Sequence, residues 1–451
     1  MATSARALAI LTVALCGFGC SNGDGSHTDE PAEDSTDALP EETVCDETRR
    51  PVLLVHGGFG GGDNYEPQGQ RFRANGYCKE WIRAFDYDSP ANLNGNTSAA
   101  TLQEMDDVVE QMRSELGFDK IHLVGHSLGT SVCRNYLLQP ENVEKIERLV
   151  HVAGGYDPAG TVPTLGLTSR GDKAVGLVEY PGAENLELPY LDHMEIISAE
   201  STFVEIYKYF NDGEAPQVTA IEPTDRIIVE GFVKNFADNT PREGIEVEVY
   251  EIDHLSGERI SETPDHLLLV DAEGRFPAWE AEPDTYYEFM IPGGGEGGRD
   301  LHSYRQPFVA TTHLVYLKAM PKPGSVGALF LGGLAPYTDD FMITVIQHTN
   351  RAIIAGDDSL TMDGIELSRP ELTDEAATIV AIFVSDENGN GVSDGTPTAR
   401  LAPAPYLTGA DTAIPTDVDG PVEITLNDAT LRIPRWRANS DGNVLVMFQD
   451  R

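Results

Sequence analysis

The sequence predicts a doubly wound, mostly parallel α/β sheet followed by an all-β domain, and three observations carry this prediction. As far as Phe210, short continuous apolar runs alternate with stretches of helical periodicity. After Pro216, short segments of alternating polarity are separated by turns rich in Gly, Pro, Asn and Asp. The chain of 451 residues is also longer than one ordinary domain, so we expect at least two folded domains.

Residues 1–20 resemble a targeting segment, with Arg6 before an apolar run that is too short to cross a bilayer. A small residue precedes Cys20, as at a bacterial lipoprotein cleavage site, although Gly17 stands where such sites carry leucine. Residues 21–45 are rich in Asp, Glu, Ser, Thr and Pro, which predicts a flexible acidic tether. We expect a secreted protein, or a cell-surface or outer-membrane lipoprotein lipidated at Cys20; an ordinary cleaved signal peptide is the alternative.

The charge balance excludes one class of partner. The chain has 31 basic and 74 acidic residues, a formal net charge of -43. Such a surface repels nucleic acid and anionic membranes. We therefore expect no nucleic-acid partner, and membrane contact only through an N-terminal lipid anchor.

The first folded domain is expected over residues 46–215. Strands are expected where the apolar runs are continuous, at 51–55, 81–87, 120–125, 146–153 and 162–168. Helices are expected at 67–75, 101–116, 128–139 and 203–210. Because strands and helices alternate, the sheet should be mostly parallel and doubly wound.

The motif Gly125-His126-Ser127-Leu128-Gly129 stands between an expected strand and an expected helix. A Gly-x-Ser-x-Gly sequence in that setting forms a sharp turn that exposes the serine at the carboxyl end of a sheet. The glycines are needed because the serine backbone is strained and neighbouring chains pass close by. Ser127 is therefore the candidate nucleophile.

A serine nucleophile needs a base, and the base needs an acid that orients it. Asp172 follows the expected strand 162–168, and His193 stands on the loop before the last expected helix. The chain order Ser127, Asp172, His193 is the order that accompanies this kind of turn. The rival acids are Asp157 and Asp192. The histidines expected to be structural, in or beside early strands, are His122, His126 and His151.

The reaction also needs N–H donors for the negative oxygen that develops on the substrate. The N–H of Leu128 qualifies because it follows the nucleophile at a helix N-terminus. The second donor should come from the glycine-rich loop after the first strand, His56-Gly57-Gly58-Phe59-Gly60-Gly61-Gly62. Gly58 is the first candidate on this loop and Phe59 the second.

Three cysteines follow Cys20 along the chain. Cys45 precedes the first expected strand and Cys78 the second, and neighbouring strands of one sheet would bring them together. We therefore expect a Cys45–Cys78 disulfide, which in the chain-entropy model contributes about 3–4 kcal/mol. Cys133, on the helix after Ser127, is expected to be a buried thiol, although a pairing that includes Cys133 is an open alternative.

The first domain resembles the bacterial and archaeal lipases of the α/β-hydrolase superfamily. The resemblance rests on Pro51-Val52-Leu53-Leu54-Val55-His56-Gly57, residues 68–77, Phe85-Asp86-Tyr87-Asp88 and residues 123–130. It is most similar to the archaeal long-chain lipase type, whose catalytic domain is followed by a C-terminal β-barrel domain. The resemblance implies a carboxylic-ester hydrolase that needs no cofactor, acts on lipid or other esters, and has a β-domain that helps to shape the acyl pocket.

Two departures from these lipases matter. They carry a long helical lid, whereas only residues 89–100 are available here, which favours shorter acyl chains. They also take their acid from the end of the preceding strand. Here that strand ends in Val152-Ala153-Gly154-Gly155 without an acid, which favours Asp172.

The all-β domain is expected over residues 216–451, either as one domain or as two with a break near residues 321–324. Residues 386–394 place oxygen ligands at alternate positions with glycine at the sixth, as in the first part of a calcium loop. Pro397 stands where the final glutamate of such a loop belongs. A structural calcium would be held by Asp386, Asn388, Asn390, the Val392 carbonyl and Asp394. A polar Asn-Gly hairpin turn is the alternative.

Together these features predict a lipase-like serine hydrolase of carboxylic esters. A polyester depolymerase or another acyl hydrolase would use the same three side chains, because acyl preference depends on the shape of the pocket. A hypothesis of a different class is a surface-binding protein that keeps a relic of the catalytic domain. The complete set of nucleophile, base, acid and oxyanion loop counts against it.

Overall fold

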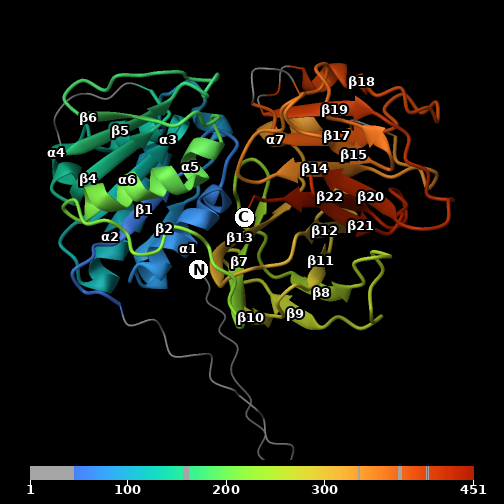
Figure 1. Ribbon diagram of the computed structural model, residues 1–451, viewed down its shortest axis with the longest axis horizontal. Helices are drawn as coiled ribbons and strands as arrows, with labels where there is room; N and C mark the ends of the chain where they lie inside the picture. The colour runs from blue at the N-terminus through green and yellow to red at the C-terminus, as the bar shows by residue number, and fades with distance from the viewer. Residues whose placement is uncertain are drawn as a thin grey trace, which may run out of the picture. The chain divides into compact units, whose positions relative to one another are not determined.

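The six strands of the first domain form one sheet in which every neighbouring pair is parallel, in the order β2-β1-β3-β4-β5-β6 (Figure 1). These strands are β1 (Val52–Val55), β2 (Ile82–Phe85), β3 (Ile121–His126), β4 (Ile146–Val152), β5 (Thr164–Ser169) and β6 (Glu184–Leu188). The computed structural model describes residues 45–155, 162–333, 336–373, 378–402, 404 and 406–450. The expected targeting segment, most of the tether and the lipidation site at Cys20 therefore lie outside the described residues.

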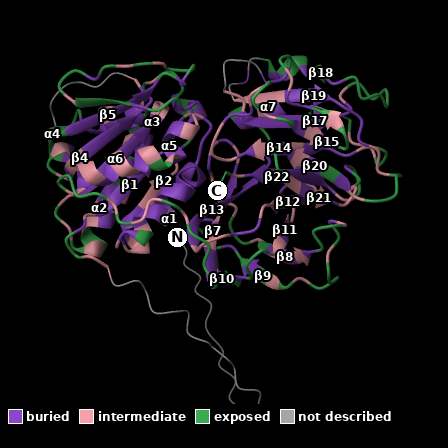
Figure 2. Cartoon of the chain, in the orientation of Figure 1, coloured by how far each residue is buried: buried purple, intermediate pink, exposed green. Residues whose placement is uncertain are grey.

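Helices cover both faces of this sheet, because successive side chains of a strand point to opposite faces. On one face, Val52 and Leu54 of β1 share a core with side chains of α1, α5 and α6. On the other face, Leu53 and Val55 pack with side chains of α2 and α3, and the strands between the two layers are largely buried (Figure 2). The helices are α1 (Glu66–Ala74), α2 (Ala99–Leu116), α3 (Leu128–Tyr136), α4 (Pro140–Val143), α5 (Glu195–Ser198) and α6 (Glu200–Phe210). The doubly wound α/β fold expected from the sequence is confirmed.

One strand of this sheet was missed in the sequence. β6 has the sequence Glu-Asn-Leu-Glu-Leu, and only its last residue is buried. It is the edge strand of the sheet and has no second neighbour to cover it. A search for continuous apolar runs finds the buried strands and passes over an edge strand of this polar kind.

Short 3-10 helices complete the first domain and recur in the second. They are η1 (Gly62–Tyr65), η2 (Lys79–Trp81), η3 (Pro90–Asn92), η4 (Glu296–Gly298) and η5 (Ala399–Leu401). Within the described residues, no helix has the length and apolar character needed to cross a membrane.

The rest of the chain is built of β-sheets, as expected, with one short helix, α7 (Val326–Leu331). One sheet has the order β10-β7-β13, a second has β18-β19-β17-β14-β22-β12-β11-β8-β9, and a third has β16-β15-β20-β21. The strands are β7 (Ile227–Asn235), β8 (Glu246–Ile252), β9 (His266–Leu269), β10 (Arg275–Ala281), β11 (Tyr286–Ile291), β12 (Leu301–Arg305), β13 (Thr312–Ala319), β14 (Thr344–His348), β15 (Leu360–Met362), β16 (Ile365–Glu366), β17 (Ala381–Ser385), β18 (Thr396–Pro397), β19 (Leu407–Asp411), β20 (Val422–Leu426), β21 (Ala429–Ile433) and β22 (Asn443–Phe448).

The largest of these sheets runs across the break that the sequence left open near residues 321–324. β22 is buried along its whole length and pairs with β12 on one side and β14 on the other. β12 precedes residues 321–324 in the chain and β14 follows them, so one sheet unites both halves. We call residues 216–450 the β-domain.

The segment that joins the two parts of the chain lies along α1. α6 ends at Phe210 and β7 begins at Ile227. Between them, the Asn75 side chain donates to the Val218 carbonyl at 2.6 Å and accepts from the Val218 N–H at 3.1 Å. All the described residues belong to one compact unit, Thr43–Arg451, in which β13 packs against α1 and η1.

Candidate active site

Ser127 is the single residue between the end of β3 and the start of α3. Its backbone has φ 51° and ψ −120°, a conformation that non-glycine residues rarely adopt. The Ser127 N–H donates to the Val152 carbonyl on the neighbouring strand at 3.0 Å. The Ser127 carbonyl accepts from the backbone N–H and the hydroxyl of Thr130. The turn is therefore held from both sides.

The glycines around Ser127 are required by close contacts. A Cβ on Gly129 would overlap the carbonyls of Val55 and His56, and a Cβ on Gly125 would lie 2.9 Å from the carbonyl oxygen of Gly129. A Cβ on Gly57 would lie 2.9 Å from the Cβ of Ser127. Real Cβ atoms do not approach other atoms this closely, so β1, the loop after it and the serine turn pack together only because these positions are glycine.

The structure brings Ser127, His193 and Asp172 together in a line. The Oγ of Ser127 lies 2.9 Å from Nε2 of His193, and Nδ1 of His193 lies 2.9 Å from Oδ2 of Asp172. Because the carboxylate can only accept, Nδ1 carries the proton, which leaves Nε2 free to accept from the serine hydroxyl. In chemical terms the imidazole is placed to act as a general base on Ser127.

Asp172 is suited to hold this histidine in one orientation. Desolvation acts to raise its pKa, but the hydrogen bond and charge of His193, with the N–H groups of Val175 and Ala174, outweigh desolvation and hold the pKa below the ordinary value. The side chain is a carboxylate at neutral pH. The rival acid Asp157 lies outside the described residues, and desolvation raises the pKa of the other rival, Asp192.

The three histidines expected to be structural are buried in the sheet. The ring of His122 stacks on Phe210 with centroids 4.1 Å apart, and that of His151 stacks on Tyr180 at 5.4 Å. His126 donates from Nε2 to the backbone carbonyl of His193 at 2.8 Å. Burial lowers the pKa of each of these three rings to about 3, so they are neutral where enzymes work.

The two expected oxyanion donors lie beside the serine turn. Within the described part of the chain, no hydrogen bond is donated by the N–H of Gly58 or by that of Leu128, the first residue of α3. A Cβ on Gly58 would lie 4.0 Å from a methyl carbon of Leu128, so the two residues are neighbours. The N–H of Phe59, the second candidate, donates to Ser89 Oγ at 2.8 Å. That bond leaves Gly58 as the better placed donor on this loop.

Two known family models match parts of this chain. Residues 50–168 match the model of the alpha/beta hydrolase fold. The first domain therefore has the α/β-hydrolase fold, and we call it the hydrolase domain. Residues 225–321, which span β7 to β13, match the model of the lipase C-terminal domain.

Among solved structures, the chain is similar to a carboxylesterase of Bacillus subtilis (15% identity over 38% of this chain and 86% of that chain, TM-score 0.27). It is also similar to a lipase of Bacillus licheniformis (15% identity over 37% of this chain and 94% of that chain, TM-score 0.30). No curated protein sequence gives a significant match. Similarities with such low identities and TM-scores carry no functional inference. The fold of the hydrolase domain is assigned from its family match and its sheet.

A mostly apolar cavity lies between the hydrolase domain and the β-domain, beside the glycine-rich loop at 56–62. From the hydrolase domain its wall includes Gly58, Phe59 and Met194. From the β-domain the wall includes Phe236, Met320, Leu331, Val345, Tyr406 and Leu407. Over 89–98, where the lipases that this domain resembles carry a lid, the chain forms only η3 and a turn, and Leu93 is half exposed. η3 contacts α7, whose Leu331 lines the cavity.

Tyr406 is a site residue that the sequence did not reveal. Its ring is parallel to that of His193, with an angle of 8° between the planes and centroids 5.9 Å apart. Burial raises the pKa of its hydroxyl, and the nearby Ser127 side chain acts in the opposite direction. Its backbone has φ 66°, and its carbonyl accepts from the N–H groups of Val380 and Ala381. No motif surrounds Tyr406, so only the packing of the two domains identifies it.

The expected calcium loop forms a network of turns. The Asp386 carboxylate accepts from the N–H groups of Asn390 and Gly391, and Asn390 Oδ1 accepts from the N–H of Val392 at 2.7 Å. The Asp394 carboxylate accepts from the N–H of Thr396. Among the described residues, no group of three or more His, Cys, Asp or Glu side chains is arranged to hold a metal ion. The hydrogen bonds are those of a polar turn, and calcium binding stays a prediction.

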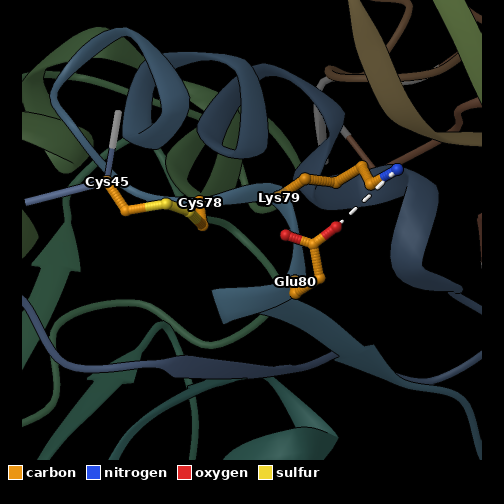
Figure 3. Close-up of a disulfide and its surroundings, with 4 residues drawn as sticks. All are labelled: Cys45, Cys78, Lys79 and Glu80. Atoms are coloured by element: carbon orange, nitrogen blue, oxygen red, sulfur yellow. Dashed lines mark ion pairs between the residues drawn. A yellow bond between two sulfur atoms is a disulfide. The ribbon is translucent and has the colours of Figure 1, made fainter. Parts of the chain in front are cut away.

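The structure pairs Cys45 with Cys78 in a disulfide, with the two Cα atoms 5.2 Å apart (Figure 3). The next residue, Lys79, lies 3.8 Å from Glu80 and 2.9 Å from Glu230 of β7, so the chain beside the disulfide also contacts the β-domain. Cys133 lies outside the disulfide, buried among the side chains of α2 and α3.

Proposed function

We propose that this protein is a serine hydrolase of carboxylic esters, lipase-like in its preference for apolar acyl groups. The observation that carries the proposal is the line of Ser127, His193 and Asp172, joined by two contacts of 2.9 Å. A hydroxyl, an imidazole and a buried carboxylate in this order are what nucleophilic attack on an acyl carbon requires.

In the first half of the proposed reaction, His193 removes the proton from Ser127 as Oγ attacks the ester carbonyl. The negative oxygen that forms would be met by the N–H groups of Gly58 and Leu128. His193 then gives its proton to the alcohol oxygen as the C–O bond breaks, which leaves an acyl group on Ser127. In the second half, His193 takes a proton from water as the water oxygen attacks the acyl carbon. His193 then gives that proton to Ser127 Oγ as the bond between Oγ and the acyl carbon breaks, which releases the acid and restores Ser127.

The apolar cavity supports the choice of substrate class. Its wall is mostly aromatic and aliphatic, with a few polar side chains such as Gln347 and Thr349, and includes Gly58, one of the proposed oxyanion donors. An acyl chain bound there would extend from the reacting carbon along a mostly apolar wall. Because the segment at 89–98 is short, we propose a preference for short to medium chains rather than strong activation at lipid interfaces.

The rest of the proposal concerns where the protein acts and what it needs. The sequence features at residues 1–45 support export, with lipidation at Cys20 as the proposed anchor. The chemistry described here uses only side chains and backbone N–H groups of the chain, so we propose a reaction without a cofactor. A calcium ion in the loop at 386–394 would be structural.

The proposal is tested by hydrolysis of p-nitrophenyl esters with acyl chains from acetyl to palmitoyl. The wild-type protein should show an optimum at short to medium chains, and Ser127→Ala should reduce turnover to background while the protein stays folded. Ser114→Ala, an exposed serine of α2, is the matched control and should keep full activity. Unchanged turnover in Ser127→Ala would rule out the proposed mechanism. A folded wild type that is inactive on every chain length would favour polymeric substrates or a binding role.

A further inference from the structure

The glycine-rich loop of the hydrolase domain is held by one amide side chain of the β-domain. Asn239 follows β7, is only 6% exposed, and has φ 56°. Its Nδ2 donates to the Gly60 carbonyl at 2.9 Å, and it lies 3.1 Å from Nε2 of His56. A third acceptor, the Tyr87 carbonyl, lies 3.3 Å away. One NH2 group of the β-domain thus reaches three positions of the hydrolase domain.

The protonation state of His56 determines which atom donates in its contact with Asn239. Its Nδ1 lies 2.7 Å from the Gly57 carbonyl, which can only accept, so Nδ1 carries the proton. Burial lowers the pKa of His56, which favours the neutral ring. Nε2 is therefore an acceptor, and it receives Asn239 Nδ2 and, at 3.4 Å, the N–H of Tyr87. The ring also stacks on that of Tyr87, with centroids 4.4 Å apart.

The two loop residues that Asn239 contacts, His56 and Gly60, lie on either side of Gly58 in the sequence. His56 precedes it by two positions and Gly60 follows it by two. Five of the seven residues from His56 to Gly62 are glycine, and glycine leaves the backbone with more freedom than any other residue. Within the loop, one backbone hydrogen bond spans Gly58, from the Gly60 N–H to the Gly57 carbonyl at 3.3 Å, and the N–H of Phe59 donates to Ser89. The N–H of Gly58 itself has no such partner among the described residues. A donor to a developing oxyanion is effective only when its direction is fixed before the reaction.

Two more contacts from β13 fix the far end of the same loop. The Tyr316 hydroxyl donates to Asp86 Oδ2 at 2.7 Å, and Asp86 Oδ1 accepts from the N–H of Gly62 at 3.0 Å. Lys318 and Asp63 form an ion pair of 2.7 Å in which each side chain is 9% exposed. These contacts hold the end of the loop, whereas Asn239, among the described side chains of the β-domain, contacts residues on both sides of Gly58.

We propose that Asn239 is a positioning residue for the reaction, which holds the loop so that the N–H of Gly58 points at the developing oxyanion. The proposal rests on the proposed function and adds to it a role for the β-domain in the chemical step. On this account the β-domain does more than line the acyl cavity, because the oxyanion loop keeps its working conformation only when Asn239 is bonded to it.

The test compares wild type with two substitutions of Asn239. Asn239→Gly removes the amide and keeps the left-handed backbone without strain, because glycine adopts positive φ readily. Asn239→Asp keeps the size of the side chain but, when ionised, cannot donate to the Gly60 carbonyl. The matched control is Asn75→Ala, because Asn75 is also a buried amide that joins the hydrolase domain to the segment before β7, yet it does not touch the loop. Melting temperatures are measured for all four proteins.

The decisive readout uses p-nitrophenyl oxo and thiono esters of the same acyl chain. Sulfur accepts hydrogen bonds weakly, so the preference for the oxo ester reports how well the oxyanion donors are aligned. Loss of a whole donor lowers kcat by about 10²–10³-fold. A misaligned donor in Asn239→Gly should therefore lower kcat on the oxo ester by about 10- to 100-fold, with KM little changed and a smaller loss on the thiono ester. Asn75→Ala should lose thermal stability but keep the oxo-to-thiono ratio of the wild type.

An unchanged oxo-to-thiono ratio in folded Asn239→Gly overturns the inference while leaving the proposed function intact. Equal losses on both esters would show a general structural effect and also overturn it. If Asn239→Gly does not fold, the oxo-to-thiono ratio is measured for Asn239→Asp instead. An unchanged ratio in that variant likewise overturns the inference. A wild-type protein that hydrolyses neither ester overturns the proposed function instead, so the two failures are distinguishable.

Discussion

The Asp192 carboxylate accepts a hydrogen bond from the backbone N–H of Ala352, 3.0 Å away in the β-domain, although Asp192 is the residue directly before His193. Its other oxygen accepts from the N–H groups of Met194 and Glu195. Both oxygens are therefore engaged with the backbone, where they hold the turn that leads into α5. The ring of His193 is bonded instead to Asp172.

This division of roles predicts different outcomes for the same substitution at the two acids. Asp172→Asn should lower kcat by about 10³–10⁴-fold, because the amide no longer holds the tautomer of His193 that can accept from Ser127. Asp192→Asn should leave kcat within about tenfold and cost on the order of 1 kcal/mol of stability, because the amide NH2 cannot accept from the Ala352 N–H. Kinetics and urea unfolding of both variants check this. A larger loss of kcat in Asp192→Asn than in Asp172→Asn would reverse the assignment.

Tyr406 should contribute to the reaction from the β-domain. Tyr406→Phe removes a buried hydroxyl near the Ser127 side chain. Since one hydrogen bond made in the reaction is worth about 1 kcal/mol, kcat/KM should fall about five- to tenfold. Tyr406→Ala should in addition raise KM, because the ring lines the cavity. Steady-state kinetics on a medium-chain ester separate the two effects. Wild-type constants in both variants would contradict a role for this side chain.

Gly129→Ala should destabilise the fold more than it changes any chemistry. The added methyl group would overlap the carbonyls of Val55 and His56, so β1 and α3 would have to separate. Overpacking of this kind costs about 1–3 kcal/mol and occasionally more. Gly117→Ala, in open space after α2 with φ 73°, tests backbone strain without such a contact. Urea unfolding should show a larger loss for Gly129→Ala, and equal losses would argue against close packing at the turn.

How much of this site was accessible from the sequence depends on where each residue lies. Ser127, Asp172 and His193 follow strands or precede a helix in one domain, so local pattern and chain order were enough to select them. β6 was missed because Glu184 and its neighbours are polar and exposed. The doubly wound sheet and the all-β character of the rest followed from hydrophobic periodicity alone.

The residues that the β-domain contributes were not accessible in the same way. Asn239 contacts His56, and the ring of Tyr406 lies against that of His193. In both pairs the two residues are far apart in the sequence. Both have positive φ, which asparagine tolerates and tyrosine seldom adopts. Nothing in the local sequence marks either position, because their role arises only when the two domains pack together.

Stability in acid should depend on a buried carboxylate of the β-domain. Desolvation acts to raise the pKa of Glu288, but hydrogen bonds from Arg259 and His302 outweigh desolvation and hold the pKa below the ordinary value. Since the folded-state pKa is depressed, Glu288 stabilises the fold above its unfolded pKa of about 4.5. That stabilisation is lost as the pH falls through the folded-state value.

Glu288→Gln should therefore cost about 3 kcal/mol at pH 7, because it leaves Arg259 without its buried partner. The difference from wild type should shrink below pH 4.5, where the unfolded wild type binds the proton. Urea unfolding at several pH values measures this difference. Glu423→Gln, which removes an exposed pair with Arg432, is the control and should change stability little at any pH. A constant difference across the pH range would mean that Glu288 is not the linked group.

The central claim, that Ser127 is an activated nucleophile, is tested most directly by covalent labelling with an alkyl fluorophosphonate followed by mass spectrometry of the peptides. A phosphonyl group should attach once per chain, on the peptide that contains Ser127, and labelling should vanish in Ser127→Ala. His193→Ala should slow it strongly, because the serine then has no base. Absence of the adduct from folded wild-type protein, or an adduct that persists in Ser127→Ala, would contradict the account.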